Sequence, residues 1–387
     1  MRIAIVINTS WNIYNFRMGL IKALLKEGME VYTIAPEDSY SHILRQRNCK
    51  FEPISIDNTG TNPFKDFTLT FDLYKIYKRI KPDVILHFTI KPNIYGTMAA
   101  KILNIPIINN VSGLGTIFLN RNYATNIALF MYKLAFQYPN WVFFQNSFDR
   151  QVFIDLRLVN NRISEVLPGS GIDIDHFRPA INTRNEKFTF LIISRLIKEK
   201  GVMEYVEAAR ILRSRGIKAV FQVIGAKEIN HSRGISINLI DEWIKEGIIE
   251  YLGVTSDVRM FINNADCIVL PSYREGTPRT LLEAASLAKP IVTTNVPGCN
   301  NVVEHGYNGY LCQMKDADDL ALKMFKIMNL SSEERKVMGE NSRKKIVEKF
   351  DEKIVIQKYL NSIYRIKFGK KIRPSVKAYI KEKLFVS

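Results

Sequence analysis

The sequence predicts an α/β fold in which two doubly wound parallel-sheet domains follow one another along the chain. Three observations indicate this. Short runs rich in valine and isoleucine recur throughout, each is followed by a segment with helical spacing of apolar residues, and 387 residues exceed what one hydrophobic core usually supports. Apolar strands that alternate with helices are typical of parallel sheets covered on both faces. We therefore expect two sheets of about six strands each.

The expected strands fall into two sets. The first set is RIAIVIN, EVYTIAP, DVILHF, PIINNV, WVFFQN and ISEVLP (residues 2–8, 30–36, 83–88, 106–111, 141–146 and 163–168). The second set is FTFLIIS, AVFQVIG, IEYLG, CIVLPS, PIVTT and GYLC (residues 188–194, 219–225, 249–253, 267–272, 290–294 and 309–312). Glycine, proline and charged residues cluster from Pro168 to Lys187, which predicts domains at 1–178 and 179–350. Residues 351–387 are expected to form a helix that returns toward the first domain, followed by a basic tail.

The composition, 47% apolar and 24% charged, is typical of a globular protein and argues against disorder. No window of 18 uncharged apolar residues predicts a membrane-spanning helix, and the apolar run at the start, broken by Asn8, reads as a strand and not as a signal peptide. The cysteines are scattered as in cytoplasmic proteins with reduced thiols; they are Cys49, Cys267, Cys299 and Cys312. The net charge of +17 favours a polyanionic ligand or surface, which nucleic acid, anionic lipid or a diphosphate would each satisfy.

The segment YREGTPRTLLEA, residues 273–284, follows the expected strand CIVLPS and predicts an anion site. Ligands of open α/β sheets bind at the carboxyl ends of the strands. Thr277 is predicted to cap the next helix, with Pro278 in its first position. The amides of Arg279 and Thr280 would then lie at the positive end of the helix dipole, where anions bind.

Charged side chains extend this predicted site. Glu275 precedes the helix and Glu283 lies about two turns along it, so the two carboxylates suit a ligand with a sugar on one side of a diphosphate and a ribose on the other. Arg195 and Lys200, in SRLIKEKG after the first strand of the second set, would bind the phosphates. Taken singly, each of these residues has a simpler interpretation as a solvated surface charge.

Five segments together resemble the ordered motifs of glycosyltransferase family 4. They are SRLIKEKG, VIGAKE, YLGVTSDV, LPSYREGTPRTLLEAASLAKPIVTTNVPG and EHGYNGYL, and the resemblance covers nearly all of residues 188–312. In the first half, HFTIKPNIYG and NNVSGLG are similar to the bacterial subgroup that extends lipid-linked or capsular oligosaccharides. The resemblance implies a GT-B fold and a retaining transferase that uses a nucleotide sugar, with UDP as the usual carrier and a hexose or N-acetylhexosamine as the sugar.

The resemblance also implies roles for individual residues. Arg195 and Lys200 would neutralise the diphosphate and, with Glu275, form the catalytic set. Glu275 would hold hydroxyls of the transferred sugar, and Glu283 would hold the ribose. The other expected donor contacts are backbone groups of Gly225, Gly253, Val254, Gly276, Thr277, Pro278, Arg279 and Thr280. No metal or other cofactor is expected, and the Asp-x-Asp formed by Asp173 and Asp175 is interpreted as structural.

The first domain departs from the wider family because its loops lack the usual Gly-Gly and the usual histidine. His87 lies at the end of the run DVILHF, one residue before Phe88, and could face a ligand, although a structural role in the core is the simpler interpretation. The predicted acceptor contacts are Asn15, His87, Lys91, Asn93, Gly113 and Gly115.

Two segments predict contact with anionic lipids of the inner leaflet, as expected of a cytoplasmic enzyme bound peripherally to the plasma membrane. In residues 122–144, apolar side chains recur at helical spacing and aromatic residues follow, although an ordinary core helix would look similar; these residues are Ile127, Phe130, Met131, Leu134, Tyr138, Phe136 and Trp141. The tail adds basic residues with aromatic ones between them; the basic residues are Lys367, Lys370, Lys371, Arg373, Lys377, Lys381 and Lys383.

Two other functions fit parts of the sequence. A UDP-sugar epimerase or a phosphorylase of the same architecture would need catalytic acids and bases, or a cofactor lysine, that we cannot identify. A nucleic-acid-binding protein would use the charge of +17, but no RNA- or DNA-binding motif is present in the sequence.

Overall fold

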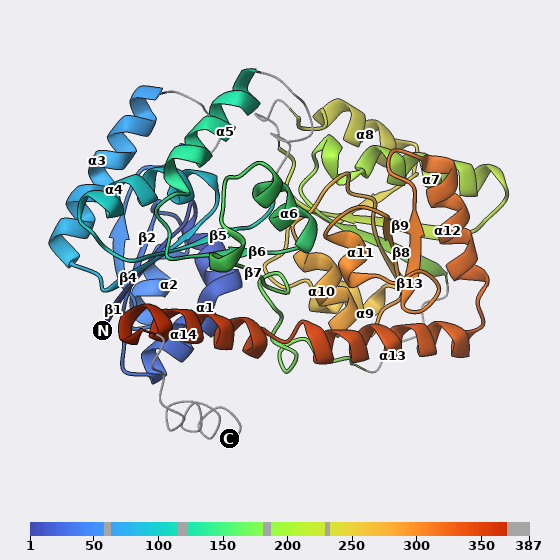
Figure 1. Cartoon of the computed structure of the whole chain (residues 1–387). Coiled ribbons are helices and arrows are strands. Elements are labelled where there is room, and N and C mark those ends of the chain that lie inside the picture. The colour runs from blue at the N-terminus through green and yellow to red at the C-terminus, as the bar shows by residue number, and fades with distance from the viewer. Residues whose placement is uncertain (58–62, 115–122, 181–186, 229–232, 370–387) are drawn as a thin grey trace. The chain divides into compact units, whose positions relative to one another are not determined.

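The computed structural model describes residues 1–57, 63–114, 123–180, 187–228 and 233–369. The chain forms two compact units, which are shown in Figure 1. Unit 1 consists of Met1–Leu167 and Lys353–Ser387, and unit 2 of Pro168–Glu352. Residues 168–178, which the sequence-based boundary placed with the first domain, belong to unit 2. The backbone N–H of Ile172 donates to the carbonyl of Phe350 at 2.9 Å, and that of Glu352 to Ile172 at 3.0 Å, which ties this segment to unit 2.

Unit 1 contains a seven-stranded parallel sheet in the order β3-β2-β1-β4-β5-β6-β7. Six strands lie within the predicted runs. Strand β3 was not predicted, because KFEP is a short edge strand in which polar and apolar residues alternate. The strands are β1 (Arg2–Val6), β2 (Glu30–Ala35), β3 (Lys50–Pro53), β4 (Val84–Phe88), β5 (Ile107–Val111), β6 (Trp141–Phe144) and β7 (Ser164–Val166).

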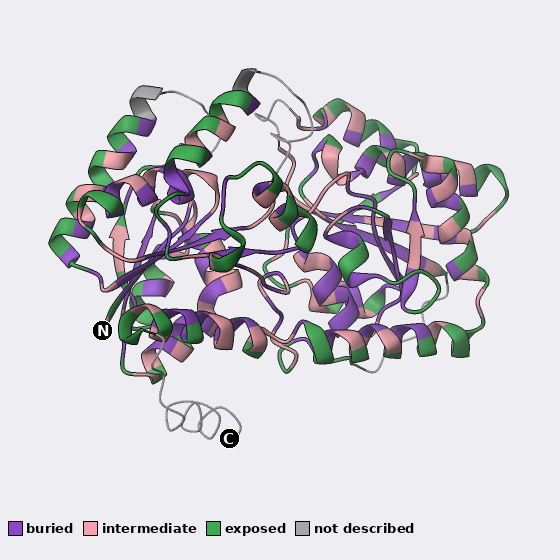
Figure 2. Ribbon diagram, viewed as in Figure 1, coloured by how far each residue is buried: buried purple, intermediate pink, exposed green. Residues whose placement is uncertain are grey.

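Helices cover both faces of this sheet. Alternate residues of β1 point to opposite sides: Ile3 and Ile5 join the core under α1 and α14, and Ala4 and Val6 join the core under α3 and α4. Helices α5 and α6 enclose a further core on the α3 side, and Figure 2 shows this burial. The helices are α1 (Ser10–Lys26), α2 (Ser41–Gln46), α3 (Pro63–Ile80), the π-helix η1 (Pro92–Gly96), α4 (Thr97–Ile102), α5 (Tyr123–Ala135), α6 (Ser147–Asp155), the 3-10 helix η3 (Asn161–Ile163) and α14 (Glu352–Phe368).

Unit 2 contains a six-stranded parallel sheet in the order β10-β9-β8-β11-β12-β13, and all six strands lie within the predicted runs. They are β8 (Phe188–Ile193), β9 (Ala219–Ile224), β10 (Glu250–Tyr251), β11 (Cys267–Leu270), β12 (Ile291–Thr294) and β13 (Gly309–Cys312). Helices α7, α8 and α12 pack on one face, and α9, α10, α11 and α13 on the other. The helices are η4 (Lys198–Lys200, 3-10), α7 (Val202–Ser214), α8 (Ile237–Lys245), α9 (Arg259–Asn264), α10 (Arg279–Ser286), α11 (Cys299–Val302), α12 (Ala317–Asn329) and α13 (Ser332–Lys349).

Candidate active site

Helix α10 begins at Arg279, after the loop that follows strand β11. Pro278 lies in the capping position with φ −71° and ψ 121°, and no side chain caps the helix. The prediction that Thr277 is the cap was therefore wrong by one position, because Pro278 itself has the extended backbone of a capping residue. Its carbonyl accepts the N–H groups of Leu281 and Leu282 at 3.1 and 3.3 Å. The N–H groups ahead of these two point out of the end of the helix, which is the arrangement that binds anions.

Lys200 and Glu275 lie together at the carboxyl edge of the unit 2 sheet. Lys200 ends η4, which follows β8, and Glu275 lies in the loop after the neighbouring strand β11. The Lys200 Nζ contacts the Glu275 carboxylate as an ion pair, and the two side chains are only 23% and 12% exposed. The fold thus joins the cation predicted to bind phosphate and the carboxylate predicted to bind sugar, which lie 75 residues apart in the sequence.

Arg195 lies farther out than Lys200. Its side chain is 56% exposed and its nearest carboxylate is that of Glu228, at 3.7 Å. At the end of β9, Gly225 has φ +151°, and a Cβ there would lie 1.7 Å from the carbonyl oxygen of Ser194, so glycine is required for packing as well as for any close ligand. The N–H of Gly225 donates to Gly253 at 2.9 Å, which brings these two predicted donor residues side by side.

Glu283 faces into unit 2 and pairs with Arg279. The Arg279 Nε donates to the Glu283 carboxylate at 3.1 Å, and the two side chains are 17% and 13% exposed. Burial raises the pKa of Glu283, while the positive charge of Arg279 acts in the opposite direction. Arg279 also donates to the carbonyl of Gly171 at 2.7 Å and to the Ser170 hydroxyl at 3.3 Å. Arg279 therefore connects the first turn of α10 to the segment at the start of unit 2.

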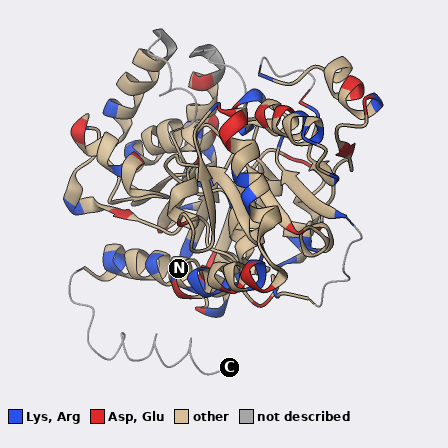
Figure 3. Ribbon diagram, turned by 90° about the vertical axis from the view of Figure 1, so that its right-hand side faces the viewer, with Lys and Arg blue, Asp and Glu red and all other residues tan. Residues whose placement is uncertain are grey.

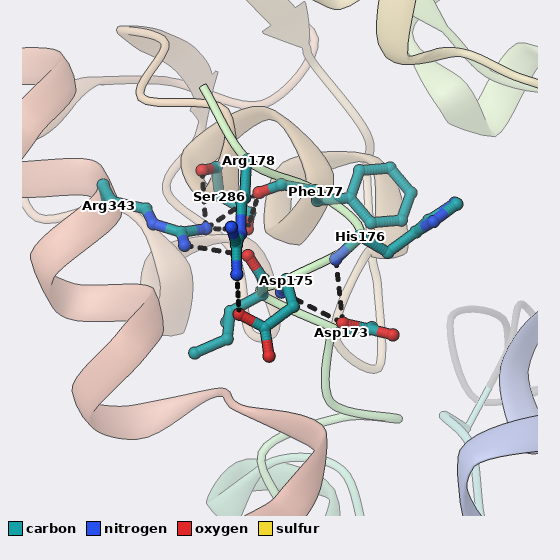
Figure 4. Close-up of polar contacts among 8 residues, drawn as sticks. Asp173, Asp175, His176, Phe177, Arg178, Ser286 and Arg343 are labelled. Atoms are coloured by element: carbon teal, nitrogen blue, oxygen red, sulfur yellow. Dashed lines mark hydrogen bonds and ion pairs between the residues drawn. The ribbon is translucent and has the colours of Figure 1, made fainter. Parts of the chain in front are cut away.

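The Asp-x-Asp sequence lies in this segment and organises its own turn, as Figure 4 shows. The Asp173 carboxylate accepts the N–H groups of Asp175 and His176 at 3.0 and 2.9 Å. Asp175 in turn pairs with Arg178 at 2.8 Å. These contacts fit the structural interpretation of the motif. Among the residues that the structure describes, no cluster of three or more His, Cys, Asp or Glu side chains is arranged to hold a metal ion.

Arg343 of α13 anchors the same turn (Figure 4). Its guanidinium donates to the carbonyls of Ile174 and Phe177, each at 2.8 Å, and to the Ser286 hydroxyl at 2.6 Å. Ser286 is the last residue of α10. One arginine side chain therefore fixes the turn, the end of α10 and α13 to one another.

In unit 1, His87 is buried and both of its ring nitrogens are hydrogen-bonded. The Tyr77 hydroxyl lies 2.9 Å from Nε2, and the Asn109 side-chain oxygen lies 2.9 Å from Nδ1. Burial lowers the pKa of His87 to about 4, so the ring is neutral at pH 7. A Cβ on Gly96 would lie 2.5 Å from Nε2, so η1 packs directly on the ring. The prediction that His87 contacts an acceptor is corrected, because the side chain is enclosed in the core.

Lys91 and Asn93 also make contacts inside unit 1. The Lys91 Nζ donates to Asp66 at 2.7 Å, and these side chains are 16% and 10% exposed. The other Asp66 oxygen accepts the Tyr95 hydroxyl at 2.9 Å. Asn93 is buried and donates to the carbonyl of Asn110 at 2.8 Å. Both predicted acceptor residues thus hold η1 against α3 and β5.

The remaining predicted acceptor residues are dispersed. Asn15 is half-buried on α1 and donates back to the carbonyl of Trp11 at 2.9 Å. Gly113, after β5, has φ +139°, a value that favours glycine. Gly115 lies outside the described residues. His87 and Asn93 are linked through the Asn109 side chain, but their hydrogen bonds do not connect them to Asn15 or Gly113.

Comparison with known proteins identifies the family. The model for "Glycosyl transferases group 1" matches residues 173–345, and that for "Glycosyl transferase 4-like" matches residues 2–146. The N,N'-diacetylbacillosaminyl-diphospho-undecaprenol alpha-1,3-N-acetylgalactosaminyltransferase of Campylobacter jejuni is 31% identical over 95% of this chain and 99% of its own length. The chain belongs to the family 4 glycosyltransferases.

Two further matches to this glycosyltransferase are informative. A UDP-Gal:alpha-D-GlcNAc-diphosphoundecaprenol alpha-1,3-galactosyltransferase of Escherichia coli is 25% identical over 74% of this chain and 76% of its own length. The crystal structure of the Anabaena protein HepE with UDP and glucose matches with a TM-score of 0.74 at 16% identity, covering 94% of this chain and 99% of that chain. The two α/β units are therefore those of a GT-B fold.

Two glycines that shape the site of the glycosyltransferase had no predicted role. Gly298, after β12, has φ +88°, and a Cβ there would lie 2.5 Å from the carbonyl oxygen of Glu275. Gly201 has φ +71°, and a Cβ there would lie 2.1 Å from the carbonyl oxygen of Pro271. These contacts press the loops after β8 and β12 against the loop that carries Glu275. The signal in the sequence that could have identified Gly298 is the Pro-Gly pair that follows an apolar strand.

The two predicted lipid-binding segments are only partly as expected. Along α5 the outward side chains are exposed, but Phe136 is buried in the core and Trp141 is half-buried under Arg365, whose guanidinium lies 4.8 Å from the indole ring. Phe136 therefore adds no exposed surface, and Trp141 is only partly exposed. In the tail, Lys367 pairs with Asp83, and residues 370–387 lie outside the described residues. None of the described helices is long and apolar enough to span a bilayer.

Proposed function

We propose that this glycosyltransferase moves a hexose or N-acetylhexosamine from a UDP-sugar to a saccharide carried on a polyprenyl diphosphate, with retention of configuration and without a metal ion. The observation that carries the proposal is the Lys200–Glu275 ion pair beside the first turn of α10. The names of the Campylobacter and Escherichia relatives, which act on undecaprenol-linked diphosphates, support the choice of acceptor.

The chemistry follows from the charges at this edge of the sheet. The bond between the sugar carbon C1 and the diphosphate oxygen breaks, and negative charge develops on the leaving UDP. Lys200, Arg195 and the N–H groups that begin α10 would stabilise that charge, as preorganised donors do in acyl and phosphoryl transfer. They would supply the charge that a divalent cation provides elsewhere. Arg195 is exposed enough to reorient toward phosphate, since its contact with Glu228 is long at 3.7 Å.

Retention requires the acceptor oxygen to bond to C1 on the face that the diphosphate leaves. The acceptor hydroxyl proton would pass to the departing diphosphate oxygen, so no enzyme nucleophile takes part. Glu275 would bind sugar hydroxyls beside Lys200, and Glu283, oriented by Arg279, would bind the ribose hydroxyls. Gly253 and Val254, next to Gly225, would line the base.

A lipid-linked acceptor stays in the bilayer, so we infer that the enzyme works at the inner face of the plasma membrane as a peripheral protein. Such an acceptor presents its diphosphate and saccharide at the headgroup level. A cationic protein gains attraction to that surface, and each basic residue close to it contributes about 1 kcal/mol.

The test compares Lys200→Met with Lys198→Met, an exposed lysine of the same η4 turn. Calorimetry with UDP should show affinity reduced about 10- to 100-fold for K200M, as expected for loss of a charge-assisted contact, and unchanged for K198M. For K200M, sugar transfer from a panel of UDP-sugars to an undecaprenyl-diphosphate-linked saccharide should fall together with the UDP affinity. Transfer by the wild-type enzyme should persist in EDTA. Wild-type UDP binding and transfer by K200M would overturn the assigned role. Activity lost in EDTA and restored by Mg²⁺ would refute metal independence.

A further inference from the structure

Helix α5 is apolar on both of its faces. Its inner face packs into the core through Tyr132, Ala135 and Phe136. Its outer face carries a stripe at helical spacing that continues past the end of the helix: Ile127, Phe130, Leu134 and Tyr138, which are 48%, 59%, 39% and 42% exposed. A helix that covers a domain normally presents polar residues to water. The outer stripe is therefore not explained by the folding of unit 1.

Helix α3 repeats this pattern. Leu69, Leu73 and Tyr77 are buried in the core beneath it. On its outer side Phe67 and Phe71, one turn apart, are 75% and 52% exposed. Large exposed apolar side chains, as on these two helices, are a feature that marks interaction surfaces.

The two helices lie on the same side of the sheet, and both pack against η1 (Figures 1 and 2). Each is a crossover helix of a parallel sheet, α3 leading into β4 and α5 into β6, so both run antiparallel to the strands. Their first turns therefore lie toward the edge where the strands end. Ligands of open α/β sheets bind at that edge. We call the outer sides of α3 and α5 the docking face.

Lysines border the docking face and lie over its rings. The Lys75 Nζ is 4.2 Å from the ring centre of Phe71, and the Lys101 Nζ is 4.9 Å from that of Tyr138. Helix α5 carries Lys133 and no acidic residue. Over the whole chain, Lys and Arg (blue in Figure 3) outnumber Asp and Glu (red) by 55 to 38.

Acidic residues on α3 weaken this charge little. The α3 sequence contains Asp66 and Asp72. Asp66 is buried in its ion pair with Lys91. Asp72 is exposed and lies 4.0 Å from the Lys75 Nζ. The docking face therefore combines exposed aromatic side chains with a net positive rim.

We propose that the docking face lies on an anionic lipid bilayer, with its aromatic side chains at the headgroup boundary and its lysines extended to lipid phosphates. This combination of apolar and basic residues is typical of helices that lie in a membrane interface. A second copy of the chain fits less well, because lysine is depleted at the centre of protein–protein interfaces. The inference rests on the proposed lipid-linked acceptor. Binding of the docking face to the bilayer would bring the ligand-binding edge of unit 1 to the surface where the acceptor diphosphate emerges.

The experiment compares Phe71→Ser/Phe130→Ser with a matched double variant, Leu322→Ser/Val337→Ser, whose residues are 46% and 45% exposed on α12 and α13 of unit 2. Flotation would use vesicles of phosphatidylcholine with and without phosphatidylglycerol. Wild type and L322S/V337S should bind the anionic vesicles equally, and F71S/F130S should bind at least about tenfold more weakly, as expected for two aromatic side chains withdrawn from an apolar phase. Lys75→Glu/Lys133→Glu should lose binding to anionic vesicles as well.

Further measurements separate the alternatives. All variants should keep the wild-type Tm, UDP affinity and transfer to a water-soluble saccharide diphosphate. Equal vesicle binding by F71S/F130S and wild type would overturn the inference, as would binding that depends only on residues 370–387 in a truncated protein. Light scattering that shows a wild-type dimer converted to monomer by F71S/F130S would assign the docking face to a second copy and would also overturn it. Vesicle binding without any sugar transfer would instead count against the proposed function alone.

Discussion

Replacing Gly298 by alanine should slow sugar transfer about 100-fold, although Gly298 itself carries no reactive group. The new Cβ would lie 2.5 Å from the Glu275 carbonyl oxygen and 2.6 Å from that of Gly276, where ordinary contact begins at 3.4 Å. The loop that carries Glu275 would have to move by about 0.9 Å. A displacement near 1 Å of a substrate-positioning group reduces turnover about 100-fold.

The control for this change is Gly306→Ala. Gly306 also has a positive φ, +80°, but a Cβ there would meet nothing within 4 Å. G306A should lose about 1–2 kcal/mol of stability in urea unfolding because alanine is strained at positive φ, and G298A should lose more because its Cβ also collides with two backbone carbonyls. Only G298A should lose turnover, measured as kcat with saturating UDP-sugar. Equal kcat values for G298A and G306A would refute the claim that the loop after β12 positions Glu275.

Two other outcomes are expected. Glu275→Ala should reduce kcat by at least about 100-fold, while the UDP affinity measured by calorimetry changes little. The reason is that Glu275 is assigned to the sugar and not to the nucleotide. Unchanged turnover would remove that assignment. Burial lowers the pKa of His87 from its ordinary 6.5 to about 4 in the folded protein. Between these pH values the unfolded chain binds more protons than the folded chain. The free energy of unfolding is therefore full above pH 6.5 and falls by about 3 kcal/mol as the pH drops toward 4. His87→Gln should flatten this part of the stability curve in urea unfolding monitored from pH 7 to 4.5, and an unchanged slope would contradict the burial effect.

Apolar runs were sufficient to predict twelve of the thirteen strands that the structure describes, because the central strands of a parallel sheet are buried on both faces and are mostly apolar. β3 escaped because an edge strand is half-exposed, and its KFEP sequence resembles a loop. The start of α10 was predicted one residue early. Pro278 satisfies the preferences of both the capping position and the first helical position, and only its ψ of 121° distinguishes them.

The contents of the candidate site were harder to predict than its location. Lys200 and Glu275 could each be proposed from the sequence, but their contact depends on β8 lying next to β11, an order that local patterns do not specify. His87 lies one residue before the end of the apolar strand β4, near the edge where ligands bind. Its partner Asn109 lies on β5, so the pairing that makes it structural arises only when β4 and β5 align.

Unit 1 is assembled from two separated stretches of chain. Helix α14 packs Val355, Tyr359 and Ile363 into the core beneath β1 and β4, yet it is synthesised after the whole of residues 168–352. At the usual 5–20 residues per second, the first 167 residues wait roughly 10–40 s on the ribosome with that side of their sheet uncovered. The nascent chain therefore presents an apolar surface to chaperones for this interval, and an N-terminal fragment expressed without α14 should aggregate.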